Sequence, residues 1–244
     1  MPKFFLSDCS FEVSDTVSIT GDDAHHISKT LRMKVGDRLV VTGSNSVDYD
    51  CVIESFTEDG VELKVEDIRQ STVEDAHRIT LFQALVKGDK MDTVVQKSVE
   101  LGVYDIYPVA AERSVVKLDA KGAEKKVERW NKIALEASKQ CGRGIIPKVH
   151  DVITFKECAE KMAELDIGFF CYELSDGKTV KDVIRDKDFT TLGFYIGPEG
   201  GVSPSEADYA KSFGIEDITL GKLILRTETA GPAVMAMLLY EIRL

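Results

Sequence analysis

The first seventy residues carry short alternating patterns of hydrophobic and polar positions that are typical of β-strands. β-Branched residues recur over Arg38–Thr42, Tyr49–Phe56 and Val61–Ile68, and turn-forming residues separate these runs. A short helix, capped by Asp22 and ending before Gly36, is predicted ahead of them. Several short strands joined by tight turns predict a small β-barrel.

The rest of the chain alternates strand patterns with helix patterns. Ile79–Val86 is a nearly continuous apolar run, which is typical of a strand buried on both faces. Val103–Val109 and Ile167–Tyr172 predict two further strands, and the helices between these strands begin after Asp89 and Thr154 as caps. This alternation predicts a mostly parallel sheet with helices on its faces, the α/β class.

A longer helix is predicted before Cys141. Its apolar stripe places Trp130 in the core, where an anchoring role is favoured over a platform for base stacking. The opposite side of this helix displays Lys125, Lys126, Arg129, Lys132 and Lys139.

Charge is distributed unevenly along the chain. The 244 residues carry a formal charge of −11, but residues 73–150 are net positive, and residues 113–148 hold ten basic and four acidic side chains. An acidic protein can present a basic face, because phosphates respond to the field within about 8–10 Å. Solvation of a helix surface explains the same lysines, and charge alone does not separate the two interpretations.

Several function classes find no support in the sequence. The five cysteines are scattered without a C-x-x-C pair and the histidines lack metal-ligand spacing, so neither a metal site nor a disulfide framework is expected. No apolar run approaches the ~18–20 residues of a membrane-spanning helix. The first residues do not resemble a signal peptide, and we expect a cytoplasmic protein without membrane attachment.

The first segment whose residues could form a functional site is 192–208, LGFYIGPEGGVSPSEAD. A buried strand is predicted to end at Ile196 and to lead into a glycine-rich loop. A helix then begins with Ser203 as N-cap, Pro204 at its first position and Glu206 closing a capping box. Neither a P-loop nor the dinucleotide fingerprint is present. Taken alone, the glycines are explained by a tight strand-to-helix turn.

The second segment is 218–243, ITLGKLILRTETAGPAVMAMLLYEIR. A strand is predicted to end at Leu220-Gly221, and a helix begins among Thr227, Glu228 and Thr229. With Thr229 as the N-cap, Pro232 would occupy the third helical position, where its missing N–H costs nothing. Two glycine-bearing loops that follow two strands predict a ligand crevice in an α/β sheet. The apolar final helix suits core packing and equally a dimer interface.

These two segments resemble a known family. IGPEGG followed by S-x-x-E, and then LGxxILRTETA, closely resemble the SPOUT methyltransferases and, within them, the RsmE family of 16S ribosomal RNA uridine-N3 methyltransferases. Val202, where an aromatic residue is frequent, and Cys141-Gly142 are conservative departures. Further matches, in the same order along the chain, are His25-His26 to Leu31-Arg32, Gly36-Asp37, Lys87, Lys97, Glu100-Leu101-Gly102, Trp130, Glu136-Ala137, Gln140 and Arg143.

The resemblance implies two domains and a cofactor. Residues 1–72 would form a PUA-like RNA-binding β-barrel, and residues 73–244 a SPOUT methyltransferase domain with a C-terminal trefoil knot. S-Adenosylmethionine would be the cofactor, no metal would be needed, and the protein would be a homodimer acting on the small ribosomal subunit. The implied cofactor-binding residues are Gly197, Pro198, Glu199, Gly200, Leu220, Gly221, Leu225, Arg226, Glu228, Thr229 and Ala230.

The implied reaction is transfer of a methyl group to N3 of one uridine near the 3′ end of 16S rRNA. Arg226 is expected to stabilise the negative charge that develops on the base, although a salt bridge to Glu228 or Glu199 would explain this arginine equally. Arg32, Lys87, Lys97 and Arg143 are the expected RNA-binding residues. Two alternatives remain open: another SPOUT enzyme that acts on tRNA or a ribose 2′-hydroxyl, and a non-catalytic RNA-binding assembly factor.

Overall fold

The protein consists of two compact units. The computed structural model describes residues 1–6, 10–43, 46–175 and 177–242, so Cys9 lies outside the described residues. The first unit is formed by Met1–Glu74 together with Ser138–Ile146, and the second by Asp75–Ala137 together with Pro147–Leu244. The sequence patterns did not indicate that residues 138–146 group with the N-terminal unit.

The first unit is built on one five-stranded sheet. Its strand order is β1-β3-β4-β5-β2, in which β1 runs parallel to β3 and the other neighbours are antiparallel. The three strands predicted from the sequence are confirmed as β3, β4 and β5, whereas β1 and β2 were missed. Their bounds are Lys3–Leu6 (β1), Thr16–Thr20 (β2), Arg38–Gly43 (β3), Val47–Phe56 (β4) and Gly60–Gln70 (β5).

The predicted helix of the first unit is present, but its cap is different. Helix α1 spans Gly21–His25 and continues as a π-helical turn, His26–Thr30. Its N-cap is Thr20, which makes no side-chain capping bond, so the prediction of Asp22 as cap was wrong. Ile27 is fully buried against the inward side chains of the sheet, so packing rather than capping stabilises the helix.

The second unit contains a parallel sheet. Strand order is β12-β10-β11-β6-β7-β8, with β9 also pairing with β7, and every pair is parallel. This confirms the predicted α/β class and mostly parallel sheet. The strands are Arg78–Ala84 (β6), Asp105–Ala110 (β7), Lys148–Val149 (β8), Ile153–Thr154 (β9), Ile167–Cys171 (β10), Thr191–Ile196 (β11) and Glu216–Ile218 (β12).

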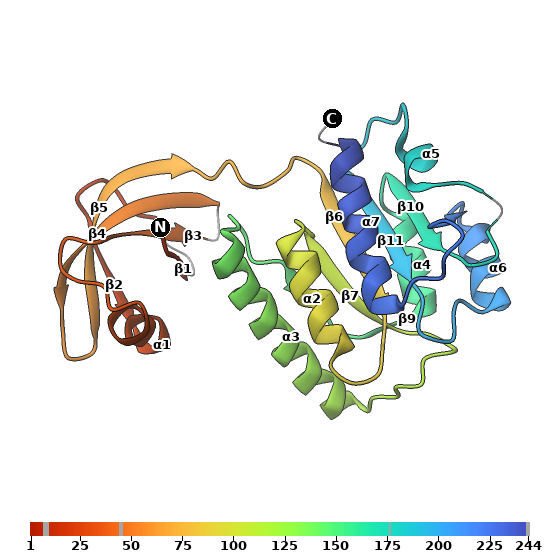
Figure 1. Cartoon of the computed structure of the whole chain (residues 1–244), viewed down its shortest axis with the longest axis horizontal. Helices are drawn as coiled ribbons and strands as arrows, with labels where there is room; N and C mark the ends of the chain where they lie inside the picture. Colours follow the sequence, from red (N-terminus) through yellow and green to blue (C-terminus); the bar gives the residue numbers. More distant parts are fainter. Residues whose placement is uncertain (7–9, 44–45, 176, 243–244) are drawn as a thin grey trace. The chain divides into compact units, whose positions relative to one another are not determined.

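Among the described residues, helices lie on both faces of the sheet of the second unit (Figure 1). Figure 1 shows the last helix in front of β6 and β11 and α4 behind them. The last helix contacts α2 and α5, whereas α4 contacts α6. None of the helices within the described residues has both the length and the apolar character needed to cross a membrane. The helices are Lys90–Glu100 (α2), Ala120–Cys141 (α3), Phe155–Ala163 (α4), Val180–Ile184 (α5), Pro204–Ser212 (α6) and Thr227–Ile242 (α7).

The helix signals in the sequence had mixed outcomes. Thr154 is confirmed as a cap, and the structure adds that it forms a capping box with Glu157. Trp130 is buried with its indole N–H donating to Asp92 at 3.1 Å, which confirms it as a core anchor. Asp89 precedes α2, but its side chain makes no capping bond. The prediction of Thr229 as a cap was wrong, because α7 already begins at Thr227 and Pro232 lies inside the helix.

Candidate functional site

The loop after β11 is the first wall of the candidate site. The predicted capping box is present: Ser203 accepts from the Glu206 N–H at 3.2 Å, and the Glu206 carboxylate accepts from the Ser203 N–H at 3.1 Å. Gly201 has a φ of +71° and donates to the carbonyl of Pro198 at 2.9 Å, which closes a tight turn. A Cβ on Gly200 would lie only 3.0 Å from the Cβ of Arg113, so a side chain there would push the loop away from its neighbour.

The loop after β12 is the second wall. It runs from Thr219 to Arg226, and Gly221 takes a φ of +104°, which favours glycine. The carbonyl of Arg226 accepts the first two helical bonds of α7, from Thr229 at 2.8 Å and Ala230 at 2.9 Å. Arg226 is therefore the N-cap residue, and the tip of the loop leads directly into the helix.

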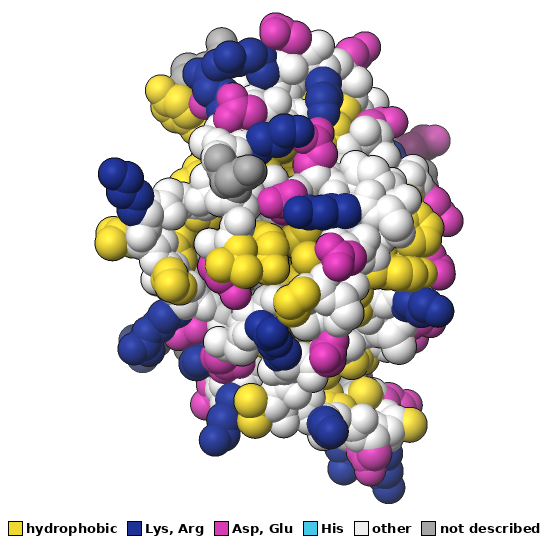
Figure 2. Space-filling model, turned by 90° about the vertical axis from the view of Figure 1, so that its right-hand side faces the viewer, with side chains coloured by type: hydrophobic (Ala, Val, Ile, Leu, Met, Phe, Trp, Pro, Cys, Tyr) yellow, Lys and Arg dark blue, Asp and Glu magenta, His cyan; other side chains and the backbone are white. Residues whose placement is uncertain are grey.

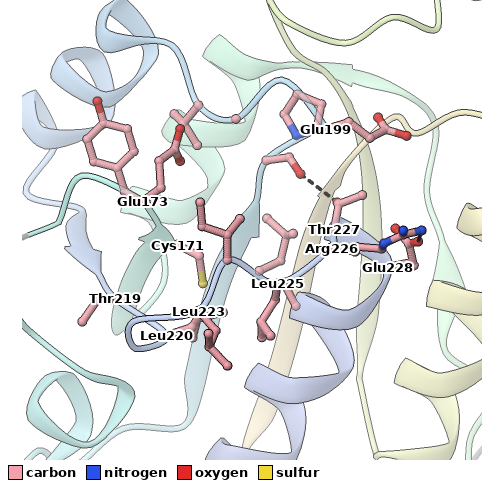
Figure 3. A pocket seen from close by; sticks show the side chains of 18 of the residues that line it. Cys171, Glu173, Glu199, Thr219, Leu220, Leu223, Leu225, Arg226, Thr227 and Glu228 are labelled. Carbon is pink, nitrogen blue, oxygen red and sulfur yellow. Dashed lines mark hydrogen bonds and ion pairs between the residues drawn. The ribbon is translucent and has the colours of Figure 1, made fainter.

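A hydrogen-bonded chain connects the two walls. The hydroxyl of Thr227 donates to the carbonyl oxygen of Gly197 at 2.8 Å and accepts from the side-chain amide of Gln83 at 3.0 Å. Figure 3 shows the bond from Thr227 as a dashed line between the helix and the opposite loop. Because Gln83 is fully buried at the end of β6, this chain ties both loops to the centre of the sheet.

The two loops enclose a pocket of about 810 Å³, a size typical of small-molecule sites. Ten of the eleven residues predicted for the cofactor line it, whereas Thr229 does not and is exposed. Leu220, Leu225 and Ala230 give the pocket apolar surface, and glutamates and lysines line its rim. The ten predicted residues are Gly197, Pro198, Glu199, Gly200, Leu220, Gly221, Leu225, Arg226, Glu228 and Ala230.

Charged groups converge on one edge of this pocket. Lys90 Nζ lies 3.0 Å from Glu199 Oε1 and 3.6 Å from Glu228 Oε2. The hydrogen bond to Glu199 raises the pKa of Lys90. Burial opposes ionisation of Glu199, but its bonds to Lys90 and to the Lys87 amide prevail and lower the pKa of its carboxyl. Both groups therefore stay charged at neutral pH.

Arg226 and Glu228 project at that same edge (Figure 3). The Arg226 guanidinium lies 3.9 Å from Glu228 Oε1 and its side chain is 82% exposed, so this ion pair is weak. Glu228 Oε2 is buried and accepts no hydrogen bond from any described residue. An acceptor of this kind suits a donor group on a ligand.

The pocket contains a cysteine, Cys171. Burial raises the pKa of its thiol far above the ordinary range, so it stays protonated and is a poor nucleophile. Cys171 and Cys158 are free thiols. Within the described residues, no cluster of three or more His, Cys, Asp or Glu side chains could hold a metal ion.

Comparison with known proteins gives the family. A family model described as an RNA methyltransferase domain matches residues 73–239, and one described as an RNA methyltransferase PUA domain matches residues 19–66. Ribosomal RNA small subunit methyltransferase E of Bacillus subtilis is 33% identical over the whole chain and 98% of its own length. The chain belongs to the ribosomal RNA small subunit methyltransferase E family, RsmE.

Other RsmE proteins match over most of their length. Ribosomal RNA small subunit methyltransferase E 2 of Borreliella burgdorferi is 31% identical, with 84% of this chain and 83% of the relative covered. The crystal structure of ribosomal RNA small subunit methyltransferase E from Neisseria gonorrhoeae bound to S-adenosyl methionine has a TM-score of 0.88 and 31% identity. The match covers 98% of this chain and 97% of the chain in that crystal structure.

Three of the four residues predicted to bind RNA are exposed in this RsmE protein. Arg32 lies in the first unit, after the π-helical turn. Lys87 lies near the pocket, where its backbone N–H donates to Glu199 at 3.3 Å. Lys97 is on α2 and pairs with Glu100 at 2.9 Å.

The fourth predicted residue, Arg143, is placed differently. Its side chain is only 5% exposed and its guanidinium makes several hydrogen bonds to the Glu74 carboxylate at 2.8–3.1 Å. The backbone amides of Gly144 and Ile145 donate to the same carboxylate, at 2.7 and 3.2 Å. The charge of Arg143 is thus used inside the first unit of this RsmE protein, and its predicted contact with RNA does not fit this structure.

Several residues of the RsmE site were missed from the sequence. Thr227 and Gln83 connect the loops, and Lys90 and Glu173 line the pocket. A signal existed for Gln83, because it is the only polar side chain within the apolar run LFQALV, and buried polar groups usually have a dedicated partner. No local pattern marked Lys90, whose partners are more than one hundred residues away.

Proposed function

We propose that this protein transfers a methyl group from S-adenosylmethionine to N3 of a uridine near the 3′ end of 16S rRNA, in the small ribosomal subunit. The observation that carries the proposal is the pocket between the two glycine-bearing loops, joined by Thr227 and Gly197, in a chain of the RsmE family. Its relatives carry the name of small-subunit ribosomal RNA methyltransferases, and one was crystallised with S-adenosyl methionine.

The pocket residues fit this cofactor chemically. Leu220, Leu225 and Ala230 provide the apolar surface that an adenine ring requires. The buried Glu228 Oε2, which accepts no hydrogen bond from the described residues, offers an acceptor to an amino or hydroxyl group, and the carboxylate of Glu173 favours a ligand that carries positive charge. We propose that Gly197, Pro198 and Gly200 approach the ligand with their backbone, since a side chain at Gly197 or Gly200 would crowd neighbouring atoms.

When bound, S-adenosylmethionine supplies a methyl group on an electrophilic sulfonium. Uracil N3 carries a proton at neutral pH, so N3 must release that proton to solvent and negative charge develops on the base. The N3–methyl bond would form as the sulfur–methyl bond breaks, which leaves S-adenosylhomocysteine as the second product. We propose that the Arg226 guanidinium stabilises this charge, because it is exposed at the pocket edge and only weakly held by Glu228. N3 also lies on the pairing edge of the base, so the uridine must be unpaired or flipped out to reach Arg226.

We propose that Arg32, Lys87 and Lys97 contact the RNA. All three are exposed, and Lys87 adjoins the pocket loop through Glu199. The assignment of RNA binding to the first unit rests on Arg32 and on the PUA family match. Since Arg143 is buried against Glu74, we leave it out of this set.

We also propose a homodimer. Leu223 and Ile224, on the loop before α7, are 80% and 89% exposed, and Met237 and Tyr240 on α7 are also exposed. Figure 2 shows hydrophobic side chains gathered near the centre of one face. Exposed apolar surface of this kind is typical of an interface. Because the proposed substrate is ribosomal RNA, we propose that the dimer acts on the small subunit in the cytoplasm.

The direct test is to identify the methylated nucleoside. Small ribosomal subunits from cells lacking this protein would be incubated with the purified full-length chain and radiolabelled S-adenosylmethionine. The expected product is N3-methyluridine, mapped by mass spectrometry to one nucleotide near the 3′ end of 16S rRNA. Label in tRNA, or a 2′-O-methylated nucleoside, would indicate a different SPOUT activity. Cofactor binding without any transfer would indicate an assembly factor.

A further inference from the structure

Ion pairs occupy much of the basic surface that the sequence displays on α3. Arg129 pairs with Asp92, and Lys132 pairs with Glu128 at 2.7 Å, one helical turn away. Such pairs neutralise positive charge locally and leave little attraction for phosphates. Exposed cations without an acidic partner therefore attract phosphates most strongly.

Four basic residues, spaced four apart in the sequence, have no such partner. Arg113, Lys117, Lys121 and Lys125 are exposed, and no Asp or Glu of the described residues lies within ion-pair distance of them. They recur every four residues, from the segment after β7 into the first turns of α3. Lys121 and Lys125 project from the same face of α3, because residues four apart are neighbours on a helix.

Arg113 connects this series to the pocket. Its Nη1 donates to the carbonyl of Gly200 at 3.2 Å and to that of Val202 at 3.4 Å. Gly200 and Val202 both line the pocket. The Nε and Nη2 groups of Arg113 donate to no described atom, so they are available to a ligand while Nη1 contacts the loop.

The acidic residues near this series are few and mostly engaged. The Asp119 carboxylate accepts from the N–H of Gly122 at 2.8 Å and caps α3. The carboxylate of Glu112 accepts from the hydroxyls of Ser203 and Ser205, at 2.7 and 2.8 Å. Glu124 is the remaining carboxylate of residues 113–126, which hold five basic side chains. Val115, between Arg113 and Lys117, is 70% exposed and adds an apolar contact.

We propose that Arg113, Lys117, Lys121 and Lys125 form an RNA track, a row of cations that binds consecutive phosphates of single-stranded RNA and leads it to the pocket. This inference rests on the proposed methylation of RNA. Phosphate contacts position a strand without specifying its sequence, which suits a row of lysines that ends at the site of chemistry. The face drawn in Figure 2 instead intersperses basic and acidic side chains.

The test measures RNA affinity as a function of salt. The probe is an unmodified transcript of the 3′ part of 16S rRNA, bound by the full-length chain and followed by fluorescence anisotropy. Each phosphate contact contributes roughly 0.7 to the magnitude of the slope of log K against log salt. For K121Q/K125Q we therefore expect this magnitude to fall by about 1.4 and the affinity at 0.15 M salt to fall about fifteenfold. The control K187Q/K211Q removes two cations that are paired with Glu216 and Asp217, and its slope is expected to match wild type.

Two further readouts separate the track from the proposed reaction. Affinity for S-adenosylmethionine, measured by calorimetry, is expected to be unchanged in K121Q/K125Q, and methyl transfer should show a raised KM for RNA with an unchanged kcat. If wild type binds the transcript more tightly and with a steeper salt slope than K121Q/K125Q and yet methylates no RNA, the proposed function is wrong and the RNA track is supported. If K121Q/K125Q binds RNA with the wild-type affinity and slope, the track is wrong.

Arg113 is tested separately because it also contacts the pocket loop. R113Q is expected to weaken binding of RNA about fourfold at 0.15 M salt, the effect of one phosphate contact, and to weaken binding of S-adenosylmethionine as well. R113K keeps the charge but loses the guanidinium whose Nη1 reaches two carbonyls, so it should restore affinity for RNA more fully than affinity for the cofactor. Equal affinity of R113Q and wild type for RNA would remove Arg113 from the track.

Discussion

Thr227 and Gly197, thirty residues apart in the sequence, are joined by a hydrogen bond of 2.8 Å from the threonine hydroxyl to the glycine carbonyl. The same hydroxyl accepts from the buried amide of Gln83 at 3.0 Å. One side chain at the start of α7 therefore fixes the distance between both pocket walls and anchors them to β6. The shape of the pocket depends on this single residue.

Replacing Thr227 by valine removes the hydroxyl and nearly preserves the volume of the side chain, and we expect it to disturb the pocket. T227V removes the donor to the Gly197 carbonyl and leaves the Gln83 amide only its bond to the Ala84 carbonyl, so the free energy of unfolding should fall by about 1–3 kcal/mol. Affinity for S-adenosylmethionine should fall with it, whereas T227S should retain both. Denaturant unfolding and calorimetry measure these quantities. Wild-type cofactor affinity in T227V would mean that the link does not shape the pocket.

Arg226 should be required for the reaction but not for holding the cofactor. Its guanidinium is largely exposed and pairs only loosely with Glu228, so R226A should bind S-adenosylmethionine nearly as wild type does. Methyl transfer to small-subunit RNA should fall at least about a hundredfold, the effect of removing one group that stabilises developing charge. Single-turnover transfer at saturating cofactor measures this, with R226K as the variant that keeps the charge. A wild-type rate of methyl transfer in R226A would show that Arg226 is not catalytic and would leave it a structural role in the loop.

Arg32 should contribute to RNA binding independently of the pocket. It is exposed in the first unit at a φ of +53°, and R32A should weaken binding of the 16S rRNA transcript about fourfold at 0.15 M salt, the effect of one phosphate contact. Cofactor affinity should not change. R38A is the matched control, since Arg38 is paired with Glu66 at 2.8 Å on the same unit. Equal losses of RNA and cofactor affinity in R32A would contradict a separate RNA-binding unit.

The buried pair of Arg143 and Glu74 should make the first unit sensitive to acid. Burial opposes ionisation of Glu74, but Arg143 and the amides of Gly144 and Ile145 prevail and lower the pKa of its carboxyl. A carboxyl with a lowered folded-state pKa stabilises the protein above its unfolded pKa of roughly 4.3, and this stabilisation is lost as the pH falls through the folded value. Thermal unfolding followed between pH 7 and pH 3 should therefore show a loss of stability below about pH 4.3.

Replacing Glu74 tests the origin of that acid sensitivity. E74Q removes the Glu74 carboxylate from the buried Arg143 guanidinium and should cost about 3–5 kcal/mol at pH 7. The dependence on pH below 4.3 should become shallower. E66Q, which removes an exposed partner of Arg38, should cost less than about 1 kcal/mol. Equal stability of E74Q and wild type at pH 7 would contradict the structural role given to Arg143.

Local patterns in the sequence were sufficient where the partners are close in the chain. The cap at Thr154 and the capping box at Ser203 were predicted correctly, because a cap and its partners lie within one helical turn. The buried strands β6 and β11 were recognised from continuous apolar runs. The two glycine-bearing loops were placed together because parallel strands end at one edge of a sheet.

Contacts between distant residues could not be predicted in the same way. The partner of Gln83 is 144 residues away and that of Arg143 is 69 residues away, so neither pair leaves a pattern in any short window. The motif match at Arg143 identified an important residue but not its role, which depends on burial. Thr229 fitted the composition of an N-cap, but the N-cap of α7 is Arg226, three residues earlier. Thr227, the first helical residue, is held there by its bond to Gly197.

The central claim is that the loops after β11 and β12 together form the binding site for the methyl donor. The most direct measurement is a crystal structure of the full-length protein grown with S-adenosylmethionine. The account predicts the ligand between Gly197–Gly200 and Leu220–Arg226, with its methyl group facing the edge at which Arg226 projects. Well-defined ligand density elsewhere on the protein, with the space between these loops empty, would contradict it.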